Sequence, residues 1–202
     1  GSLKGSLSSR VARSLTKYIL PHVDFGVDFH TGGASRYNYP QIRYNSNDEQ
    51  SQALAEAFAA PVTLAKRPPE KSLRKVAAKA GIPILIFEGG EALRFDGFAI
   101  QQAMEGTQRL LAQQGMLEQS PGAPTHQYHF TKTTWIRAPR SGIFEWTQNA
   151  GTFVKEGEFL GTIRDPYGQY ETRVKSRKTG FIIGHNNAPV ISQGDALFNI
   201  AW

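Results

Sequence analysis

The sequence contains no cysteine, and none of its apolar runs approaches the roughly 20 residues that a helix needs to cross a bilayer. The first absence excludes disulfide bonds and thiolate chemistry, so any metal must be held by histidine and carboxylate side chains. The second predicts a soluble protein without a membrane partner, and we expect it in the cytoplasm. Its 202 residues, 40% of them hydrophobic, suffice for one or two domains.

The chain also lacks a long basic run, although its formal net charge is +6. Lysine and arginine are scattered along it and are not interleaved with aromatic residues, as they are in many nucleic-acid-binding proteins. This distribution argues against nucleic acid as a partner. A positive charge spread over the molecule attracts small anions instead. We therefore expect a small acidic substrate.

Residues 23–33 combine a strand pattern with a chemically useful side chain. Apolar residues alternate with polar or small ones up to position 29, and the pattern stops at a pair of glycines. His30 therefore lies at the carboxyl end of the predicted strand, where open α/β sheets bind ligands. Asp28 can orient a metal-binding imidazole. Taken alone, a hydrogen-bonded structural histidine is the commoner role at such a position.

A second apolar run, residues 81–87, ends at Glu88 and again precedes two glycines. Its composition is typical of a strand buried on both faces of a parallel sheet. If the two strands are parallel neighbours, His30 and Glu88 open onto the same edge. A metal ligand and a group that moves protons are the minimum for metal-assisted hydrolysis.

The segment between these strands has weaker patterns. Residues 32–50 are rich in Gly, Asn, Ser and Tyr, which predicts a long loop over the strand ends. Asn38 and Arg43 in this loop are candidate substrate contacts, with ordinary loop capping by Asn38 as the alternative. Apolar spacing and helix-breaking residues predict helices over residues 7–19, 48–60, 70–80 and 98–115.

Residues 28–33, 37–43 and 87–96 together resemble the succinylglutamate desuccinylase/aspartoacylase family, which comprises zinc-dependent amidohydrolases with a carboxypeptidase-A-like fold. The resemblance covers nearly the whole chain. It implies zinc as the cofactor, His30 as the last of three zinc ligands and Glu88 as the general acid–base. Family members also place a substrate-binding arginine before the catalytic strand. Arg74 is the nearest match here, with a solvated helix face as the alternative.

One large departure from the family pattern concerns the other two zinc ligands. Members carry an upstream His-x-x-Glu pair and then an Arg- and Asn-containing loop that grips the substrate carboxylate, and neither is present in these 202 residues. We therefore expect the chain to be the C-terminal part of such an enzyme. A sheet edge and helix faces left uncovered in this way favour a homo-oligomer.

The end of the chain has a different pattern. Residues 119–130 are rich in proline and glycine and predict a linker, in which His126 and His129 are poor candidates for metal ligands. Residues 131–202 contain two similar β-rich halves and resemble the barrel-sandwich hybrid of biotinyl and lipoyl domains. The turn at residues 165–168 contains no lysine, so we expect neither biotin nor a lipoyl group there.

These observations predict an α/β fold in which residues 1–118 form the C-terminal part of a carboxypeptidase-A-like zinc-hydrolase domain. An all-β barrel-sandwich domain follows at 131–202 and shapes the active site or mediates assembly. The predicted reaction is hydrolysis of the amide bond of an N-acyl amino acid or a similar small acidic amide. The alternative is a non-catalytic binding or assembly protein on the same fold, with an incomplete metal site.

Overall fold

Strands β1 (Gly26–Gly32) and β4 (Ile84–Glu91) lie side by side in the computed structural model, which describes residues 1–202. They are parallel, and His30 is aligned with Glu88 in their register. The expectation that the two strands bring His30 and Glu88 to one edge is thus confirmed. Glycines follow both residues. Gly90 has a positive φ of 72°, which residues with a side chain rarely adopt.

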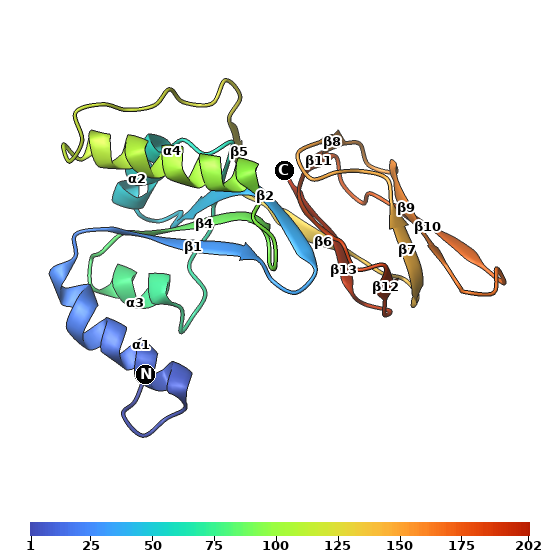
Figure 1. The fold of residues 1–202 in the computed structure, drawn as a ribbon, viewed down its shortest axis with the longest axis horizontal. Coiled ribbons are helices and arrows are strands. Elements are labelled where there is room, and N and C mark those ends of the chain that lie inside the picture. Colours follow the sequence, from blue (N-terminus) through green and yellow to red (C-terminus); the bar gives the residue numbers. More distant parts are fainter.

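The predicted helices form close to their expected bounds. They are α1 (Leu7–Ser14), which continues through a π-helical turn to Ile19, α2 (Glu49–Phe58), α3 (Leu73–Lys79) and α4 (Gly97–Gln113). Side chains of Ser6, Asp48, Ser72 and Asp96 accept hydrogen bonds from backbone N–H groups at the four N-termini, which explains where the helices begin. Helices α2 and α4 cover one face of the sheet and α3 lies on the other (Figure 1).

Residues 36–44 form strand β2 (Arg36–Tyr44), so the prediction of a long loop over residues 32–50 is wrong. The strand runs antiparallel to β4, and its register shifts between Asn38 and Gln41, around Pro40. This bulge interrupts the alternation of side chains by one residue. The strand therefore shows no continuous period of two in the sequence.

A single nine-stranded sheet runs through both halves of the chain, in the order β1-β4-β2-β11-β13-β6. Strand β2 pairs with β11 (Gly180–Asn186). This pairing joins the α/β half of the chain (residues 1–118) to its β-rich half (residues 131–202). Three short strands extend the sheet beside this path. They are β3 (Val62–Ala65), β5 (Tyr128–Phe130) and β8 (Phe153–Val154). Because β5 pairs with β3, the last three residues of the predicted linker are a strand.

The β-rich half packs two sheets around its own core (Figure 1). Its further strands are β6 (Thr133–Arg137), β7 (Gly142–Trp146), β9 (Phe159–Arg164), β10 (Glu171–Lys175), β12 (Val190–Ile191) and β13 (Ala196–Ala201). The second sheet has the order β10-β9-β7-β12. Fully buried Leu160, Ile163 and Leu197 lie in the core between them. Gly157 and Gly194, which recur in the sequence repeat, have φ values of 84° and 91° and form turns.

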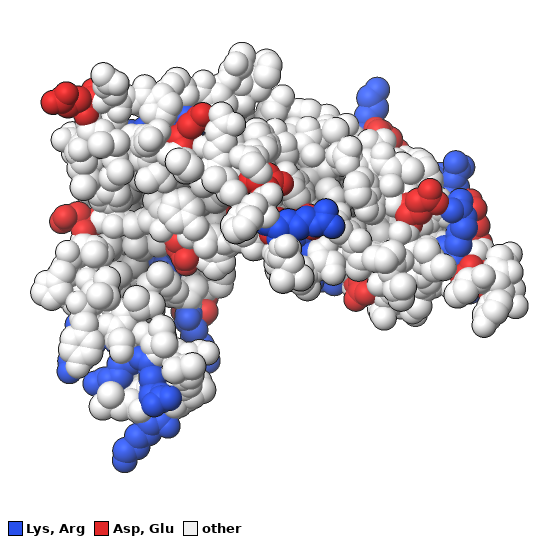
Figure 2. Space-filling view, viewed as in Figure 1, with Lys and Arg blue, Asp and Glu red and all other residues white.

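Helix α1 differs from the others because none of its residues is buried. Leu7, Val11 and Leu15 are 69%, 51% and 41% exposed. Basic residues gather at the lower left of Figure 2, where Figure 1 places α1, and no acidic residue precedes Asp24 in the sequence.

No helix of the molecule combines the length and the apolar character needed to span a membrane. The homo-oligomer stays a prediction.

His185 of β11 is a buried histidine that we expect to make the stability of the fold depend on pH. Its ring is buried against Trp146, with 4.5 Å between the ring centroids, and its Nδ1 accepts the N–H of Ala150 at 3.2 Å. Burial lowers the pKa of His185 from 6.5, so the unfolded chain takes up a proton before the folded one does. Stability should therefore fall as the pH falls through about 6.5.

We expect His185→Gln to flatten this pH dependence. The free energy of unfolding, measured by urea titration between pH 7.5 and 5, should lose less on acidification than in the unchanged protein. His126→Gln, at an exposed position, is the control and should keep the original slope. Equal slopes in all three proteins would remove His185 from the pH response.

Candidate active site

The carboxylate of Glu88 is held from two sides by strand β2. Asn38 Nδ2 donates to Glu88 Oε2 at 2.8 Å, and Arg43 Nη1 lies 3.4 Å from Oε1. The Glu88 side chain is 16% exposed, so both contacts are shielded from bulk water. Charge-assisted contacts of this kind are stronger than hydrogen bonds between neutral groups. The direction of the carboxylate is therefore set by the protein.

The bulge in β2 explains how Asn38 and Arg43 both reach Glu88. They are five residues apart, and an odd spacing in a regular strand places side chains on opposite faces. The register pairs Asn38 with Gly90 but Gln41 with Glu88, so β2 has one extra residue over this interval. The extra residue brings both side chains to the face of Glu88. Loop capping by Asn38 is thus ruled out.

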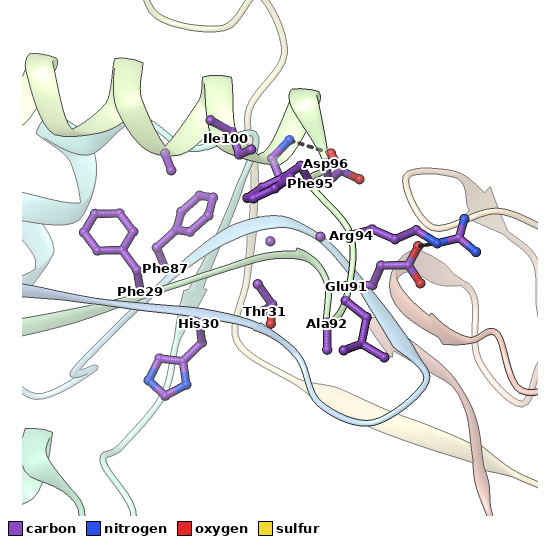
Figure 3. Close-up of a pocket in the computed structure, with 15 residues that line it drawn as sticks. Phe29, His30, Thr31, Phe87, Glu91, Ala92, Arg94, Phe95, Asp96 and Ile100 are labelled. Atoms are coloured by element: carbon purple, nitrogen blue, oxygen red, sulfur yellow. Dashed lines mark hydrogen bonds and ion pairs between the residues drawn. The ribbon is translucent and has the colours of Figure 1, made fainter.

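His30 lies on the neighbouring strand with Asp28 as its partner. The two side chains meet with 3.0 Å between His30 Nε2 and Asp28 Oδ2, and they are 47% and 36% exposed. Figure 3 shows that His30 points away from α4, whereas Phe29 and Phe87 point toward this helix. His30 and Asp28 alternate with Phe29 on the strand, so the polar residues lie on the face of the sheet that carries α3.

Arg74 of α3 supplies a buried positive charge beside this polar face. It is only 6% exposed, which rules out the alternative of a solvated helix face. Its Nε and Nη1 atoms have no hydrogen-bond partner. Burial lowers the pKa of Arg74, and nearby Arg43 lowers it further, whereas Glu88 and Asp28 oppose the shift. All three residues thus act electrostatically on Arg74, and its free donors are suited to an anion.

The residues of this chain do not complete a zinc site among themselves. A catalytic zinc takes three protein ligands, but no group of three or more His, Asp and Glu side chains lies close enough to hold a metal ion. His30 with Asp28 is the one histidine–carboxylate contact. The donor set at the polar face is therefore one imidazole and carboxylates that already have partners.

An apolar cavity of about 610 Å³ lies mostly on the opposite face of the sheet. It is enclosed by β1, α4 and the segment between β4 and α4, with Phe29, Phe87, Phe95 and Ile100 among its lining residues (Figure 3). Glu88 and Arg74 do not line it. His30 does line it, so the cavity adjoins the strand end that carries the zinc ligand implied by the family resemblance but does not include Glu88.

Gln41 is a residue of the cluster that sequence patterns missed. It is completely buried on β2 and contacts Arg43. Its position inside the family-like segment 37–43 is the one available signal, because a glutamine between a proline and an isoleucine has no distinctive pattern.

Comparisons with known proteins give one family match and several solved structures of similar fold. The family model for the succinylglutamate desuccinylase/aspartoacylase catalytic domain matches residues 2–114. No curated protein matches the chain in sequence. Among solved structures, the apo ectoine utilization protein EutE (DoeB) from Ruegeria pomeroyi has a TM-score of 0.90 at 20% identity, over 100% of this chain and 67% of that one.

Two further structures have similar scores. A succinylglutamate desuccinylase/aspartoacylase from Rhodobacter sphaeroides has a TM-score of 0.89 at 25% identity, over 100% of this chain and 65% of that one. An aspartoacylase family protein from Mesorhizobium loti has 0.81 at 20% identity, over 97% and 68%. The chain thus spans about two thirds of the length of these relatives. With the family model matching more than half of its residues, the chain belongs to the succinylglutamate desuccinylase/aspartoacylase family.

Proposed function

We propose that this chain carries the acid–base and substrate-binding part of a deacylase that hydrolyses the amide bond of an N-acyl amino acid or a similar small acidic amide. The observation that supports it most is the oriented Glu88 carboxylate, with Asn38 and Arg43 on its two oxygens. Family membership supports the reaction class. We also propose a carboxypeptidase-A-like core for residues 1–118 and a barrel-sandwich hybrid for residues 131–202.

Each side chain of the cluster has a distinct role in this proposal. Glu88 takes a proton from the attacking water and passes it to the leaving amine. Arg74, with its two free donor atoms, binds the carboxylate of the substrate, and Arg43 and Asn38 line the approach to it. The planar fork of a guanidinium suits a carboxylate because it donates two parallel hydrogen bonds.

Zinc is the cofactor that membership of this family implies, and it would polarise the amide carbonyl when bound. His30 is the proposed ligand, and Asp28 the residue that orients it. Because the residues of this chain do not complete a zinc site, the steps above rest on protein groups alone.

The incomplete donor set also favours a second candidate function. A non-catalytic protein that binds small anions at Arg74 would need neither zinc nor proton transfer. N-acetylaspartate serves as a probe of both candidates. NMR titration should move the guanidinium signals of Arg74 in either case, whereas release of the free amino acid by the natively expressed protein supports the deacylase alone. Absence of both effects would refute both functions.

The zinc affinity of the purified chain is a direct test of the donor set. We expect calorimetric titration to show binding weaker than micromolar, because one imidazole cannot replace three ligands. His30→Ala should weaken it further, and His126→Ala, in the proline-rich segment, is the matched control. Tight stoichiometric binding that His30→Ala abolishes would show that the chain contains a complete site.

Arg74→Met should separate binding from stability. Because Arg74 is buried with unpartnered donors, its removal should leave the midpoint of thermal unfolding unchanged or raise it. Affinity for N-acetylaspartate should fall at least about tenfold, as expected for the loss of a charge-assisted contact worth about 1.5–3 kcal/mol.

Arg109→Met is the matched control for this variant. Arg109 is equally buried, but its three nitrogens donate to the carbonyl oxygens of Phe58, Ala59 and Gly122 at 3.0, 3.2 and 2.9 Å. Its replacement should cost about 2–4 kcal/mol of stability, because two buried carbonyls and one partly buried carbonyl lose their donor. A comparable loss of stability in Arg74→Met would assign Arg74 a structural role.

A further inference from the structure

Gln41 connects the surroundings of Glu88 to the β-rich half of the chain. Its side chain is fully buried between β2 and β11, and its Nε2 donates to the carbonyl oxygen of Ile183 on β11 at 3.1 Å. The same Nε2 also lies 3.2 Å from the carbonyl oxygen of Tyr39. A buried amide with two carbonyl acceptors has one stable orientation. Its oxygen, Oε1, therefore points in a fixed direction.

That oxygen accepts from Arg43. Arg43 Nε and Nη2 lie 3.4 Å and 3.3 Å from Gln41 Oε1, and the remaining nitrogen, Nη1, is the atom that contacts Glu88. Because a guanidinium is planar and rigid, fixing its Nε and Nη2 edge also fixes the direction of Nη1. Gln41 thus determines where the positive charge beside Glu88 is placed.

The next residue of β11 makes room for the other partner of Glu88. A Cβ atom at Gly184 would lie only 2.9 Å from Asn38 Oδ1 and 2.8 Å from the carbonyl oxygen of Tyr37. Real Cβ atoms rarely come so close to oxygen, so a side chain at position 184 would displace the Asn38 side chain or the backbone of Tyr37. Consecutive residues of β11, Ile183 and Gly184, therefore act on the two groups that hold the Glu88 carboxylate.

We propose that Gln41 is a positioning residue, through which strand β11 of the β-rich half orients Arg43 and, with Gly184, the carboxylate of Glu88. The inference rests on the proposed function for its catalytic meaning, but its structural part is independent of activity. In this proposal the β-rich half orients the groups around Glu88 and does not merely cover the site.

The structural part is tested by NMR on the 202-residue chain. In the unchanged protein, the Nε–H of Arg43 should exchange with water at least tenfold more slowly than that of Arg10, which lies exposed on α1. Exchange at the same rate in both would overturn the proposal without the need for any variant. Gln41→Leu should shift and broaden the Arg43 signal. Gln102→Leu, at another buried glutamine whose Oε1 has no partner, should leave it unchanged.

The catalytic part is tested on the natively expressed protein. Gln41→Leu should lower turnover at least about tenfold, because a small displacement of groups around a reacting centre is costly, and Gln102→Leu should not. Gly184→Ala should shift the side-chain amide signals of Asn38. A displaced Arg43 signal with full turnover would overturn the catalytic role. If the unchanged protein hydrolyses no N-acyl amino acid, the proposed function fails, while the NMR results still decide whether Gln41 positions Arg43.

Discussion

Glu88→Gln should lower the turnover of the natively expressed protein on its substrate by at least about 100-fold. Losing a general acid–base typically costs about 10²–10⁴-fold. Glutamine has nearly the same shape, and its carbonyl oxygen can still accept a hydrogen bond from Asn38, so the surrounding structure should remain intact. The loss therefore comes from proton transfer, and it should appear in steady-state turnover at saturating substrate.

Glu91→Gln is the matched control for this variant. Glu91 lies on the same strand, with its side chain 19% exposed, and its partners are Arg94 and Asn187. It has no contact with Asn38 or Arg43 and should retain nearly full turnover. Comparable activity of Glu88→Gln and the unchanged protein would remove Glu88 from the mechanism.

Phe58→Ala should destabilise the fold by about 3–5 kcal/mol, as is typical when a buried phenylalanine is truncated. Phe58 is completely buried between α4, where its ring lies against Gly106, and Phe87, 5.7 Å away between ring centroids. In a chain of this size the loss corresponds to roughly 10 °C in the unfolding midpoint. Phe95→Ala, at a position 98% exposed, is the control and should change the midpoint by about 1 °C or less.

The same variant tests the proposed division at residues 118 and 131. All three tryptophans, Trp135, Trp146 and Trp202, lie in the β-rich half, so their fluorescence reports on that half. Because β2 and β11 share one sheet, Phe58→Ala should lower the midpoint seen by tryptophan fluorescence as much as that seen by circular dichroism. An unchanged fluorescence midpoint would show that the two halves unfold separately.

Local patterns in the sequence predict those strands and helices whose formation depends mainly on their own residues. Strands β1 and β4 have clear apolar runs ending at glycines, and α2 and α4 have capping residues close to their predicted starts. Strand β2 could not be predicted because the bulge at Pro40 breaks its alternation. Strand β5 is only three residues long and depends on pairing with β3, which no local pattern indicates.

The candidate site shows the same limit. The sequence predicts that His30 and Glu88 share an edge because each terminates an apolar run, and their register confirms it. The contacts of Asn38 and Arg43 with Glu88 depend on one extra residue in β2, and those of Gln41 depend on a strand from the far end of the chain. Such contacts arise from tertiary structure, so sequence spacing alone does not reveal them.

The bond between Gln41 and Ile183 also has a consequence for the order of folding. The two residues are 142 positions apart in the chain, and contacts of such long range form slowly because a large loop must close first. During synthesis, β1, β2 and β4 emerge long before β11 is available. The contacts around Glu88 should therefore form last. During refolding, Arg43 Nε–H should become protected from hydrogen exchange later than the backbone amides of β1.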